Sequence, residues 1–400
     1  MVAQRPSAPR DNKGTTASQK GKSPLGKIEK LVYGGEGLLR ENGQAILVPF
    51  AAPGDDWQEG KLRESAAERI APACPVFTRC GGCHYQHLPY PLQVEWKKEI
   101  LRETLARLGH VDSPTIAART GEPWRYRNRV QVHFNGRRLG FHAARSHSLV
   151  TVDRCPIASP AIERAMLALA EMAPSFLRTV ELFSNEESTL VSVMDAAKPL
   201  RRSFFTELAR AIPGADQSAL DYPVGGDRFR VSYRAFFQVN RFLIEPLVSE
   251  AIAQADSMEA WDLYAGVGLM SIPLARRCER VTAVEVVSSA AHDLEMNAQR
   301  HGVRLNVVRG STEDFLAAQT SAPRFVLADP PRAGLGKRVT DQLRRLRPAR
   351  LTIVSCDPST LARDLRALSD LYQLESLTLV DLFPQTFHIE AIARLISKSA

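Results

Sequence analysis

Two residues near the C-terminus have types and positions that suit covalent chemistry. Cys356 lies in Ser355-Cys356-Asp357-Pro358, where an apolar strand expected at 351–355 ends and a helix begins. Parallel α/β sheets place their chemistry at this edge, and a strand end, a proline turn and a helix N-terminus together favour a thiolate. Glu390 interrupts the apolar run 388–396, and a buried carboxylate there requires a reason. Cys278, by contrast, fits a small buried hydrophobe.

A glycine-containing turn follows the first strand of the same expected sheet. The sequence reads Asp262-Leu263-Tyr264-Ala265-Gly266-Val267-Gly268, and a helix follows. Glycines at such a turn let a ligand approach the backbone, and the helix N-terminus faces that ligand. The second strand ends at Glu285, 17 residues after Gly268, where a carboxylate can accept hydrogen bonds from a ribose diol. A dinucleotide site is the alternative, but its six-residue fingerprint is incomplete because position 271 is Ser.

The fourth expected strand ends in Asp329-Pro330-Pro331-Arg332. The proline pair fixes an extended turn beside the ligand crevice. Together with the glycine turn and Glu285, this turn favours S-adenosylmethionine over NAD. An amino-directed adenine methyltransferase would need an aromatic residue at position 332, where this chain has Arg.

Three motifs in this order resemble the uridine-C5 RNA methyltransferase family: Asp-Pro-Pro-Arg at 329–332, Ser-Cys-Asp-Pro at 355–358, and Phe-Pro-Gln-Thr-Phe-His-Ile-Glu at 383–390. The resemblance runs from about residue 27 to the C-terminus. It implies that Cys356 attacks C6 of uracil, that S-adenosylmethionine methylates C5, and that Glu390 removes the C5 proton. The chemistry agrees, because C5 is a poor nucleophile until addition at C6 creates an enolate, and a base must then restore aromaticity.

The expected cofactor contacts come partly from the turn and partly from this resemblance. Leu269 stands where the family often has Asn, and the contact near Ser311 depends on an uncertain alignment. The expected cofactor-binding residues are Gln238, Tyr264, Gly266, Gly268, Glu285, Ser311 and Asp329.

Four cysteines, Cys74, Cys80, Cys83 and Cys155, form a candidate metal site. Zinc and iron–sulfur clusters both use four thiolates, so the spacing leaves both open. The string Cys80-Gly81-Gly82-Cys83-His84-Tyr85-Gln86-His87 resembles the cluster-bearing branch of the same family. That resemblance implies a structural or RNA-positioning [4Fe-4S] cluster and favours 23S ribosomal RNA over transfer RNA. Radical S-adenosylmethionine chemistry is excluded, because it requires Cys-x3-Cys-x2-Cys.

The charge of the chain indicates a polyanionic partner. The net charge is +8 and the isoelectric point is about 9.3. Residues 119–154 carry eight Arg against two acids. Bases of looped RNA stack on aromatic rings while Arg holds phosphate, although a charged sheet face over core aromatics has the same pattern. The interleaved rings are Trp124, Tyr126, Phe134, Phe141, His142 and His147. We expect a monomer that binds RNA, and neither DNA nor a membrane; a target uracil must be flipped out to reach Cys356.

With 400 residues the chain predicts two or three domains. We expect a disordered basic tail over 1–26 and a short TRAM-like β-barrel over 27–70, truncated after Pro53-Gly54. A mixed α+β iron–sulfur and RNA-binding domain follows over 71–240, with an amphipathic helix over 91–108. Alternating strands and helices over 241–400 predict an α/β, Rossmann-like class I methyltransferase domain.

The chain lacks an apolar run of about 18 residues and a secretory signal at its start, so we expect a cytoplasmic protein. Two alternatives to the main interpretation stay open. One is the same chemistry on a T-loop uridine of transfer RNA, against which the cysteine set argues. The other is a catalytically silent RNA-binding or redox-sensing protein, against which intact Cys356, Glu390 and the glycine turn argue.

Overall fold

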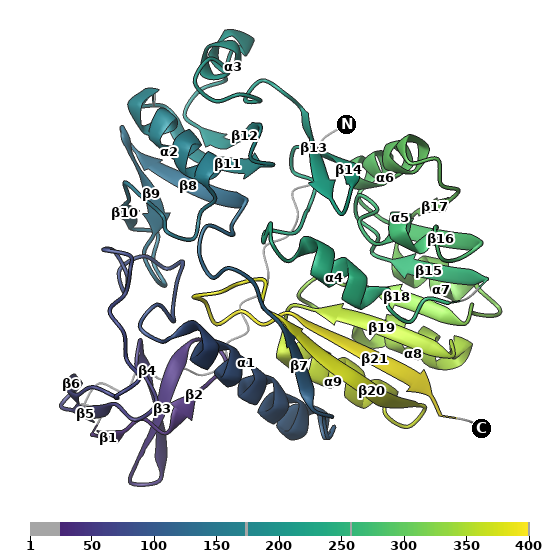
Figure 1. Cartoon of the computed structure of the whole chain (residues 1–400), viewed down its shortest axis with the longest axis horizontal. Helices are drawn as coiled ribbons and strands as arrows, with labels where there is room; N and C mark the ends of the chain where they lie inside the picture. The colour runs from purple at the N-terminus through teal and green to yellow at the C-terminus, as the bar shows by residue number, and fades with distance from the viewer. Residues whose placement is uncertain (1–24, 173–174, 257, 399–400) are drawn as a thin grey trace.

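The largest element of the protein is an eight-stranded mixed sheet formed mostly by its C-terminal part (Figure 1). The structure is a computed structural model that describes residues 25–172, 175–256 and 258–398, so nearly all of the predicted tail 1–26 lies outside it. The strands lie in the order β17 (Asn306–Arg309), β16 (Arg280–Glu285), β15 (Glu259–Leu263), β18 (Phe325–Ala328), β19 (Arg350–Ser355), β21 (Ala391–Ser397), β20 (Tyr372–Val380) and β7 (Ile116–Arg119).

Five neighbouring strands of this sheet, from β17 to β19, are parallel, as the alternating pattern predicts. Strand β21 runs antiparallel to β19, and β20 runs antiparallel to β21. The middle of this parallel set is covered on both faces, and β18 is wholly apolar, with all four of its residues fully buried. The helices of this part are α4 (Ile244–Ala251), α5 (Ser271–Leu274), α6 (Ser288–Arg300), α7 (Thr312–Ala318), α8 (Gly336–Leu346) and α9 (Pro358–Leu368).

The edge strand β7 and the helix before it come from earlier in the chain. The predicted helix 91–108 forms as α1 (Tyr90–Thr104), which continues as a π-helical turn over Leu105–Gly109. Leu101 and Leu105 are fully buried in the core that also contains residues of β19 and α9. Strand β7 pairs in parallel with β20. Both elements therefore pack on the eight-stranded sheet, although they fall within the range 71–240 expected to form a central domain.

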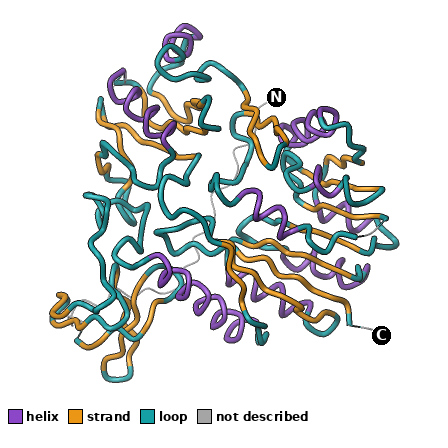
Figure 2. The backbone as a smooth tube through the Cα atoms, in the orientation of Figure 1, coloured by secondary structure: helices purple, strands orange, loops and turns teal. Residues whose placement is uncertain are grey.

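A second, antiparallel sheet of five strands lies beside the first, with helix α2 (Pro160–Met172) packed on it through Ile162, Met166 and Leu169 (Figure 1). Helix α3 (Arg202–Leu208) follows the last strand. In Figure 2 the middle of the molecule, between the sheets, is mostly loop. The strand order is β10 (Leu149–Thr151), β9 (Arg138–His142), β8 (Arg129–Asn135), β11 (Leu177–Ser184) and β12 (Thr189–Ala196).

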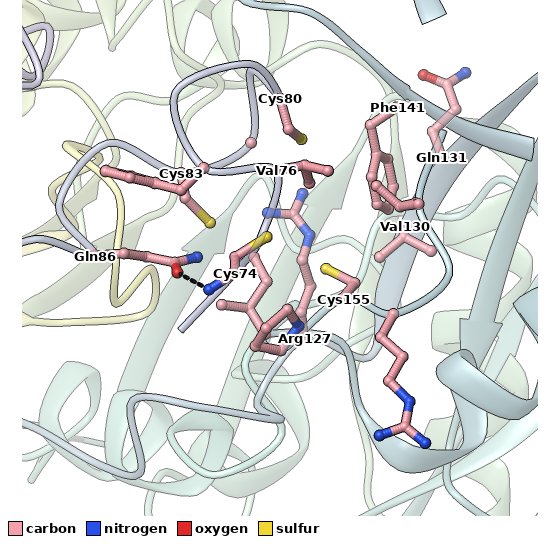
Figure 3. A pocket seen from close by; sticks show the side chains of 16 residues that line it. Cys74, Val76, Cys80, Cys83, Gln86, Arg127, Val130, Gln131, Phe141 and Cys155 are labelled. Atoms are coloured by element: carbon pink, nitrogen blue, oxygen red, sulfur yellow. Dashed lines mark hydrogen bonds between the residues drawn. The ribbon is translucent and has the colours of Figure 1, made fainter. Parts of the chain in front are cut away.

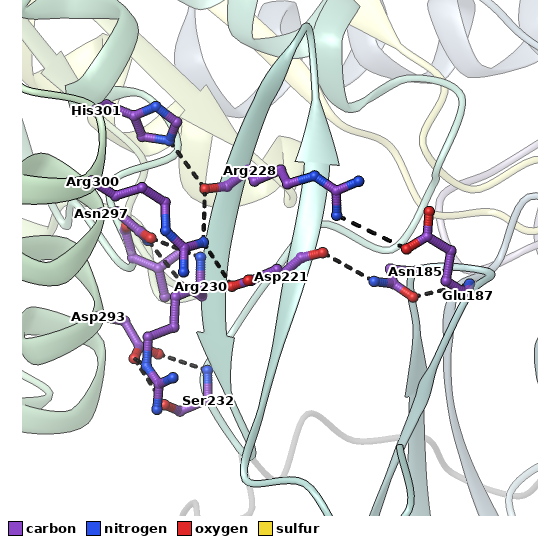
Figure 4. Close-up of polar contacts among 11 residues, drawn as sticks. Asn185, Glu187, Asp221, Arg228, Arg230, Ser232, Asp293, Asn297, Arg300 and His301 are labelled. Carbon is purple, nitrogen blue, oxygen red and sulfur yellow. Dashed lines mark hydrogen bonds and ion pairs between the residues drawn. The ribbon is translucent and has the colours of Figure 1, made fainter. Parts of the chain in front are cut away.

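A hairpin of β13 (Ala219–Val224) and β14 (Asp227–Ser232) connects the two sheets (Figure 4). Asp293 of α6 accepts hydrogen bonds from Ser232 N at 2.6 Å and from Arg230 Nε at 3.1 Å. On the other side, Asn185 Nδ2 donates to Asp221 O at 3.0 Å. The hairpin is thus fixed to α6 by half-buried polar contacts and to the five-stranded sheet by an exposed one.

The N-terminal module, residues 25–64, consists of two three-stranded sheets, which are β1-β5-β6 and β2-β3-β4. The predicted end after Pro53-Gly54 is wrong, because two strands follow it. Buried Asp55 accepts hydrogen bonds from Ala52 N at 2.7 Å and Ala66 N at 2.9 Å, which fixes the chain beyond that turn. The strands are β1 (Gly26–Lys27), β2 (Lys30–Leu31), β3 (Glu36–Glu41), β4 (Gln44–Pro49), β5 (Asp56–Gln58) and β6 (Lys61–Glu64). Among the described residues, we find no helix with the length and apolar character needed to cross a membrane.

Candidate active site

The pairing of β19 with β21 brings the two candidate catalytic residues together. In this antiparallel pair Ser355 is opposite Ala391, so Cys356 and Glu390 are the next two facing positions, at the carboxyl end of β19. Cys356 is half-buried and Glu390 is buried, with 5% of its surface exposed. Burial, and then the neighbouring Glu390 carboxylate, raise the pKa of the Cys356 thiol to about 11.

The turn after β18 adds an acid and a cation to this pair. Burial raises the pKa of Asp329 to about 7. Burial, and then the charge of Asp329, raise the pKa of Glu390 well above its ordinary value, while Arg332 lowers it. Arg332 also lowers the pKa of Cys356, and its Nη2 lies 3.4 Å from His388 Nδ1. The sequence did not single out Arg332 or His388 for this site, although both stand inside the quoted motifs.

The helix that follows Cys356 does not lower the pKa of its thiol as expected. Asp357 is the N-cap of α9, and its Oδ1 accepts hydrogen bonds from Ser359 N at 2.8 Å and Thr360 N at 3.1 Å. The first N–H groups of the helix are therefore occupied by a carboxylate. The expected stabilisation of a thiolate is wrong for this state of the protein, because burial dominates and raises the thiol's pKa.

The glycine turn at the end of β15 lies next to Glu285 at the end of β16. Glu285 accepts hydrogen bonds from Gly266 N at 2.8 Å and Val287 N at 2.6 Å. Each carboxylate oxygen keeps a second lone pair for another donor. Tyr264 and Gly266 both have positive φ, of 65° and 56°, which gives the turn its sharp bend.

The two glycines of this turn have different reasons to be glycine. A Cβ at Gly266 would meet no atom within 4 Å, so open space lies in front of this residue. A Cβ at Gly268 would lie 2.4 Å from Leu294 Cδ1 of α6. Gly268 therefore allows close packing of α6 on the turn, and its role in admitting a ligand stays a prediction.

The remaining expected cofactor residues lie at neighbouring strand ends or in the segment before α4. Asp329 N donates to Leu263 O at 3.3 Å, next to Tyr264. Ser311 follows β17, but its hydroxyl caps α7 by accepting from Asp314 N at 3.0 Å. Gln238 is buried, and its carbonyl accepts from Asn128 Nδ2 at 3.1 Å. Leu269 is buried and apolar, so it offers no polar contact.

The four cysteines of the candidate metal site line one cavity of about 190 Å³ (Figure 3). Burial raises the pKa of Cys83 to about 12 and of Cys155 to about 11. Gln86 Oε1 accepts from Cys74 N at 3.0 Å and so holds the cysteine segment together. Within the described ranges, no three acidic, histidine or cysteine side chains converge closely enough to hold a single metal ion. Cys278 is buried in the core near β16, as its small apolar character predicts.

The arginine-rich segment 119–154 divides into buried and exposed parts. Tyr126 is fully buried, and its hydroxyl donates to Pro384 O at 2.9 Å, so this ring is not available to stack on a base. Phe134 and Phe141 pack against the core of the five-stranded sheet. Exposed cations remain on the same segment, namely Arg125, Arg137, Arg138, Arg145 and Arg154, with exposed His147 beside them.

The chain is similar to known RNA methyltransferases. A family model described as tRNA (Uracil-5-)-methyltransferase matches residues 223–398. An uncharacterised RNA methyltransferase of Aquifex aeolicus is 32% identical, over 92% of this chain and 97% of that protein. One from Halalkalibacterium halodurans is 28% identical, over 93% of this chain and 96% of that protein.

A solved structure shares the fold. The tRNA (uracil-54, C5)-methyltransferase of Pyrococcus abyssi, in complex with S-adenosyl-L-homocysteine, has a TM-score of 0.72 and 23% identity. The match covers 93% of this chain and 100% of the Pyrococcus abyssi chain. The sheet order and this likeness define the class I methyltransferase fold. The chain belongs to the uridine-C5 RNA methyltransferase family, and it is an S-adenosylmethionine-dependent RNA methyltransferase.

Proposed function

We propose that this enzyme methylates C5 of a specific uridine in 23S ribosomal RNA through a covalent bond between Cys356 Sγ and C6 of uracil. The observation that carries the proposal is the β19–β21 register, which sets a thiol beside a buried carboxyl group at one strand end. Addition at C6 requires a nucleophile such as the thiol, and proton removal at C5 requires a base such as the carboxylate.

The reaction uses the chain's own groups in sequence. Cys356 loses its proton to solvent, its sulfur bonds to C6, and the electron pair of the C5–C6 double bond moves to the C4 carbonyl as an enolate. S-Adenosylmethionine, when bound, would supply the methyl group to C5 and would leave as S-adenosylhomocysteine. Glu390 accepts the C5 proton, the C5–C6 double bond forms again, and the Cys356 thiolate leaves. The raised pKa of Glu390 makes it a stronger base, and Arg332 stabilises negative charge on both groups.

The turn after β15 fits S-adenosylmethionine. Open space in front of Gly266 admits a ligand to the backbone, and the free lone pairs of Glu285 suit two ribose hydroxyls. Val286, with 62% of its surface exposed, offers an apolar surface to a base. We assign further contacts to Tyr264, Asp329 and Gln238; Ser311 is the weakest assignment, because its hydroxyl is used as a helix cap.

The four cysteines fit a [4Fe-4S] cluster better than zinc. Zinc holds each sulfur at about 2.3 Å, so four thiolates must converge on one point. Here the thiols surround one cavity, yet no three of them converge within the described residues. A [4Fe-4S] cluster also takes four cysteine thiolates, and it would not require them to converge on one metal ion. Cys74, Cys80, Cys83 and Cys155 would hold it.

A trapping experiment tests the covalent step. Cys356→Ala cannot form the C6 bond, so no covalent RNA complex should appear. Glu390→Gln should still add the thiolate and transfer the methyl group, then stall, because elimination requires loss of the C5 proton. The stalled complex should survive denaturing electrophoresis and carry the label of methyl-labelled S-adenosylmethionine. Normal turnover by Glu390→Gln, or trapping by Cys356→Ala, contradicts the mechanism.

Transfer RNA is the second candidate substrate, because the matching family description and the Pyrococcus abyssi enzyme both name it. The cysteine set favours ribosomal RNA. Mapping 5-methyluridine in ribosomal and transfer RNA of a deletion strain separates the two. Loss from 23S ribosomal RNA alone supports the proposal, and loss from the T-loop alone overturns its substrate.

A further inference from the structure

The segment between β20 and β21, which leads to Glu390, reaches into the middle of the molecule (Figure 1). We refer to residues 381–388 as the base loop. Its centre, Gln385, is buried and has a φ of +67°, a left-handed conformation that costs free energy for any residue other than glycine. Such a conformation persists only where surrounding contacts determine it.

The backbone carbonyl of Gln385 is held by the cysteine segment. His84 N and Tyr85 N both donate to Gln385 O, at 2.8 and 3.0 Å. These two residues directly follow Cys83, one of the four cysteines on the cavity in Figure 3. The His84 ring also packs on Phe387, with centroids 4.7 Å apart. A single residue therefore receives two hydrogen bonds from the chain that leaves the cysteine site.

The other polar groups of Gln385 are held by helix α1. Gln385 N donates to Gln93 Oε1 at 2.9 Å, and Gln93 Nε2 donates to Gln385 Oε1 at 2.9 Å. Gln93 Nε2 also lies 3.1 Å from Tyr85 O and 2.8 Å from Leu88 O. Gln93 is fully buried, so this amide joins the cysteine segment, α1 and the base loop at one point.

We propose that Gln385, held by Gln93, is the positioning residue through which the four-cysteine site fixes the base loop and hence Glu390. The cysteine site would then contribute to catalysis without contacting the substrate. A fixed conformation of the cysteine segment would keep the base loop, which leads to Glu390, in one conformation. Buried amide contacts suit this task, because a partner left unpaired in the interior costs much more than one exposed to water. The part of the inference that concerns catalysis rests on the proposed function, whereas the mechanical coupling does not.

Hydrogen–deuterium exchange on the full chain, isolated without oxygen, tests the coupling. Gln93→Met keeps the side-chain volume but removes the amide. Cys155→Ser changes the cysteine site at a residue that makes no hydrogen bond to the base loop among the described contacts. Both variants should raise exchange in peptides covering 381–390 by about tenfold or more, as loss of buried hydrogen bonds allows. Ser232→Ala, which removes the half-buried hydrogen bond from Ser232 Oγ to Asp293 Oδ1 in Figure 4, is the control and should leave these peptides unchanged.

Unchanged exchange at 381–390 in Gln93→Met overturns the role of Gln385. Faster exchange in Gln93→Met but not in Cys155→Ser overturns the coupling to the cysteine site. A second measurement separates positioning from general loss of stability. In Gln93→Met a larger fraction of methyl-labelled RNA should remain covalently bound during a single turnover, while S-adenosylmethionine affinity stays the same. Because exchange does not depend on the reaction, failure of the covalent mechanism would abolish the trapped RNA and leave the exchange result intact.

Discussion

Tyr33 of the N-terminal module donates a hydrogen bond from its hydroxyl to Asp357 Oδ2, at 3.2 Å, beside the candidate nucleophile. Its ring also meets Phe387 of the base loop edge-to-face, with centroids 5.6 Å apart. Asp357 in turn caps α9 through its other oxygen. One residue of the N-terminal module thus contacts segments on both sides of the site, the turn after Cys356 and the loop before Glu390.

Removing only this hydroxyl should slow the enzyme more than it destabilises it. For Tyr33→Phe we expect the free energy of unfolding to fall by about 1 kcal/mol, the usual value of one hydrogen bond. The rate at saturating RNA should fall several-fold, because Asp357 loses a contact that orients the turn after Cys356. Tyr372→Phe is the control, since Tyr372 Oη donates to Pro348 O at 2.9 Å, away from the site. Equal rates in the two variants would show that the Tyr33 hydroxyl has no part in catalysis.

A buried ion pair anchors the start of the base loop. Lys97 Nζ of α1 lies 2.6 Å from Asp381 Oδ1 and 2.9 Å from Phe383 O, and neither charged side chain has exposed surface. Lys97→Met should lower the free energy of unfolding by about 3–5 kcal/mol, because it leaves a buried charge without its partner. Lys97→Met combined with Asp381→Leu should recover much of that loss. Urea denaturation measures both; a double variant less stable than Lys97→Met would contradict this account.

The regular elements of the catalytic part were predictable because burial on both faces leaves a local pattern. The apolar strand expected at 351–355 corresponds to β19 within about one residue. The pairing of distant segments leaves no such pattern. Strand β7 joins β20 across more than 250 residues of sequence, and only the folded chain shows it as the eighth strand.

The site residues divide in the same way. Cys356 and Glu390 were identifiable because each departs from its surroundings, a thiol at a strand end and a carboxyl group in an apolar strand. Ser271, which breaks the dinucleotide fingerprint, donates to buried Asp262 Oδ2 at 2.5 Å, a reason that the sequence alone does not contain. Gln93 is one polar residue on an amphipathic helix, and its role is visible only through contact with Gln385, 292 positions away.

Substitutions at the two glycines of the turn should affect cofactor binding and packing separately. Gly266→Ala adds a methyl group to open space, so it should weaken S-adenosylmethionine binding with a stability loss of about 1 kcal/mol from its positive φ. Gly268→Ala should lower the melting temperature more, because its Cβ overlaps Leu294. Leu294→Ala should cost less stability in the Gly268→Ala protein than in the unchanged protein, because it removes the overlap. Calorimetry and thermal unfolding check both; a Gly266→Ala protein with normal cofactor affinity would refute the site.

The cysteine site predicts a specific metal content. Protein purified without oxygen should be brown, with broad absorption near ~400 nm and about four irons per chain. Cys155→Ser should lose the iron as completely as Cys80→Ser, because both thiols line the same cavity although they are far apart in sequence. Cys278→Ser is the control, since Cys278 lies in a different core. Stoichiometric zinc without iron would exclude the cluster.

The environment of Cys356 predicts how its reactivity depends on pH. Burial and Glu390 raise the pKa of the thiol to about 11 from an ordinary 9.0, and only the thiolate reacts with iodoacetamide. Alkylation near neutral pH should therefore be about a hundredfold slower than for an exposed cysteine, and it should rise with pH towards 11. Because the folded-state pKa exceeds the ordinary one, this thiol's contribution to stability is complete below about pH 9 and is lost as the pH rises through about 11.

The neighbours of Cys356 should shift this reactivity in opposite directions. Glu390→Gln removes the carboxylate that raises the thiol's pKa, so it should speed alkylation between about pH 8 and pH 10. Arg332→Gln removes the guanidinium that lowers this pKa, so it should slow alkylation over the same range. Peptide mass spectrometry, without RNA or cofactor, follows Cys356 separately from the other cysteines. Slower alkylation in Glu390→Gln, or faster alkylation in Arg332→Gln, would contradict the assignment of these two residues to one electrostatic site around the thiol. The opposite signs matter, because a general loosening of the structure would speed alkylation in both variants.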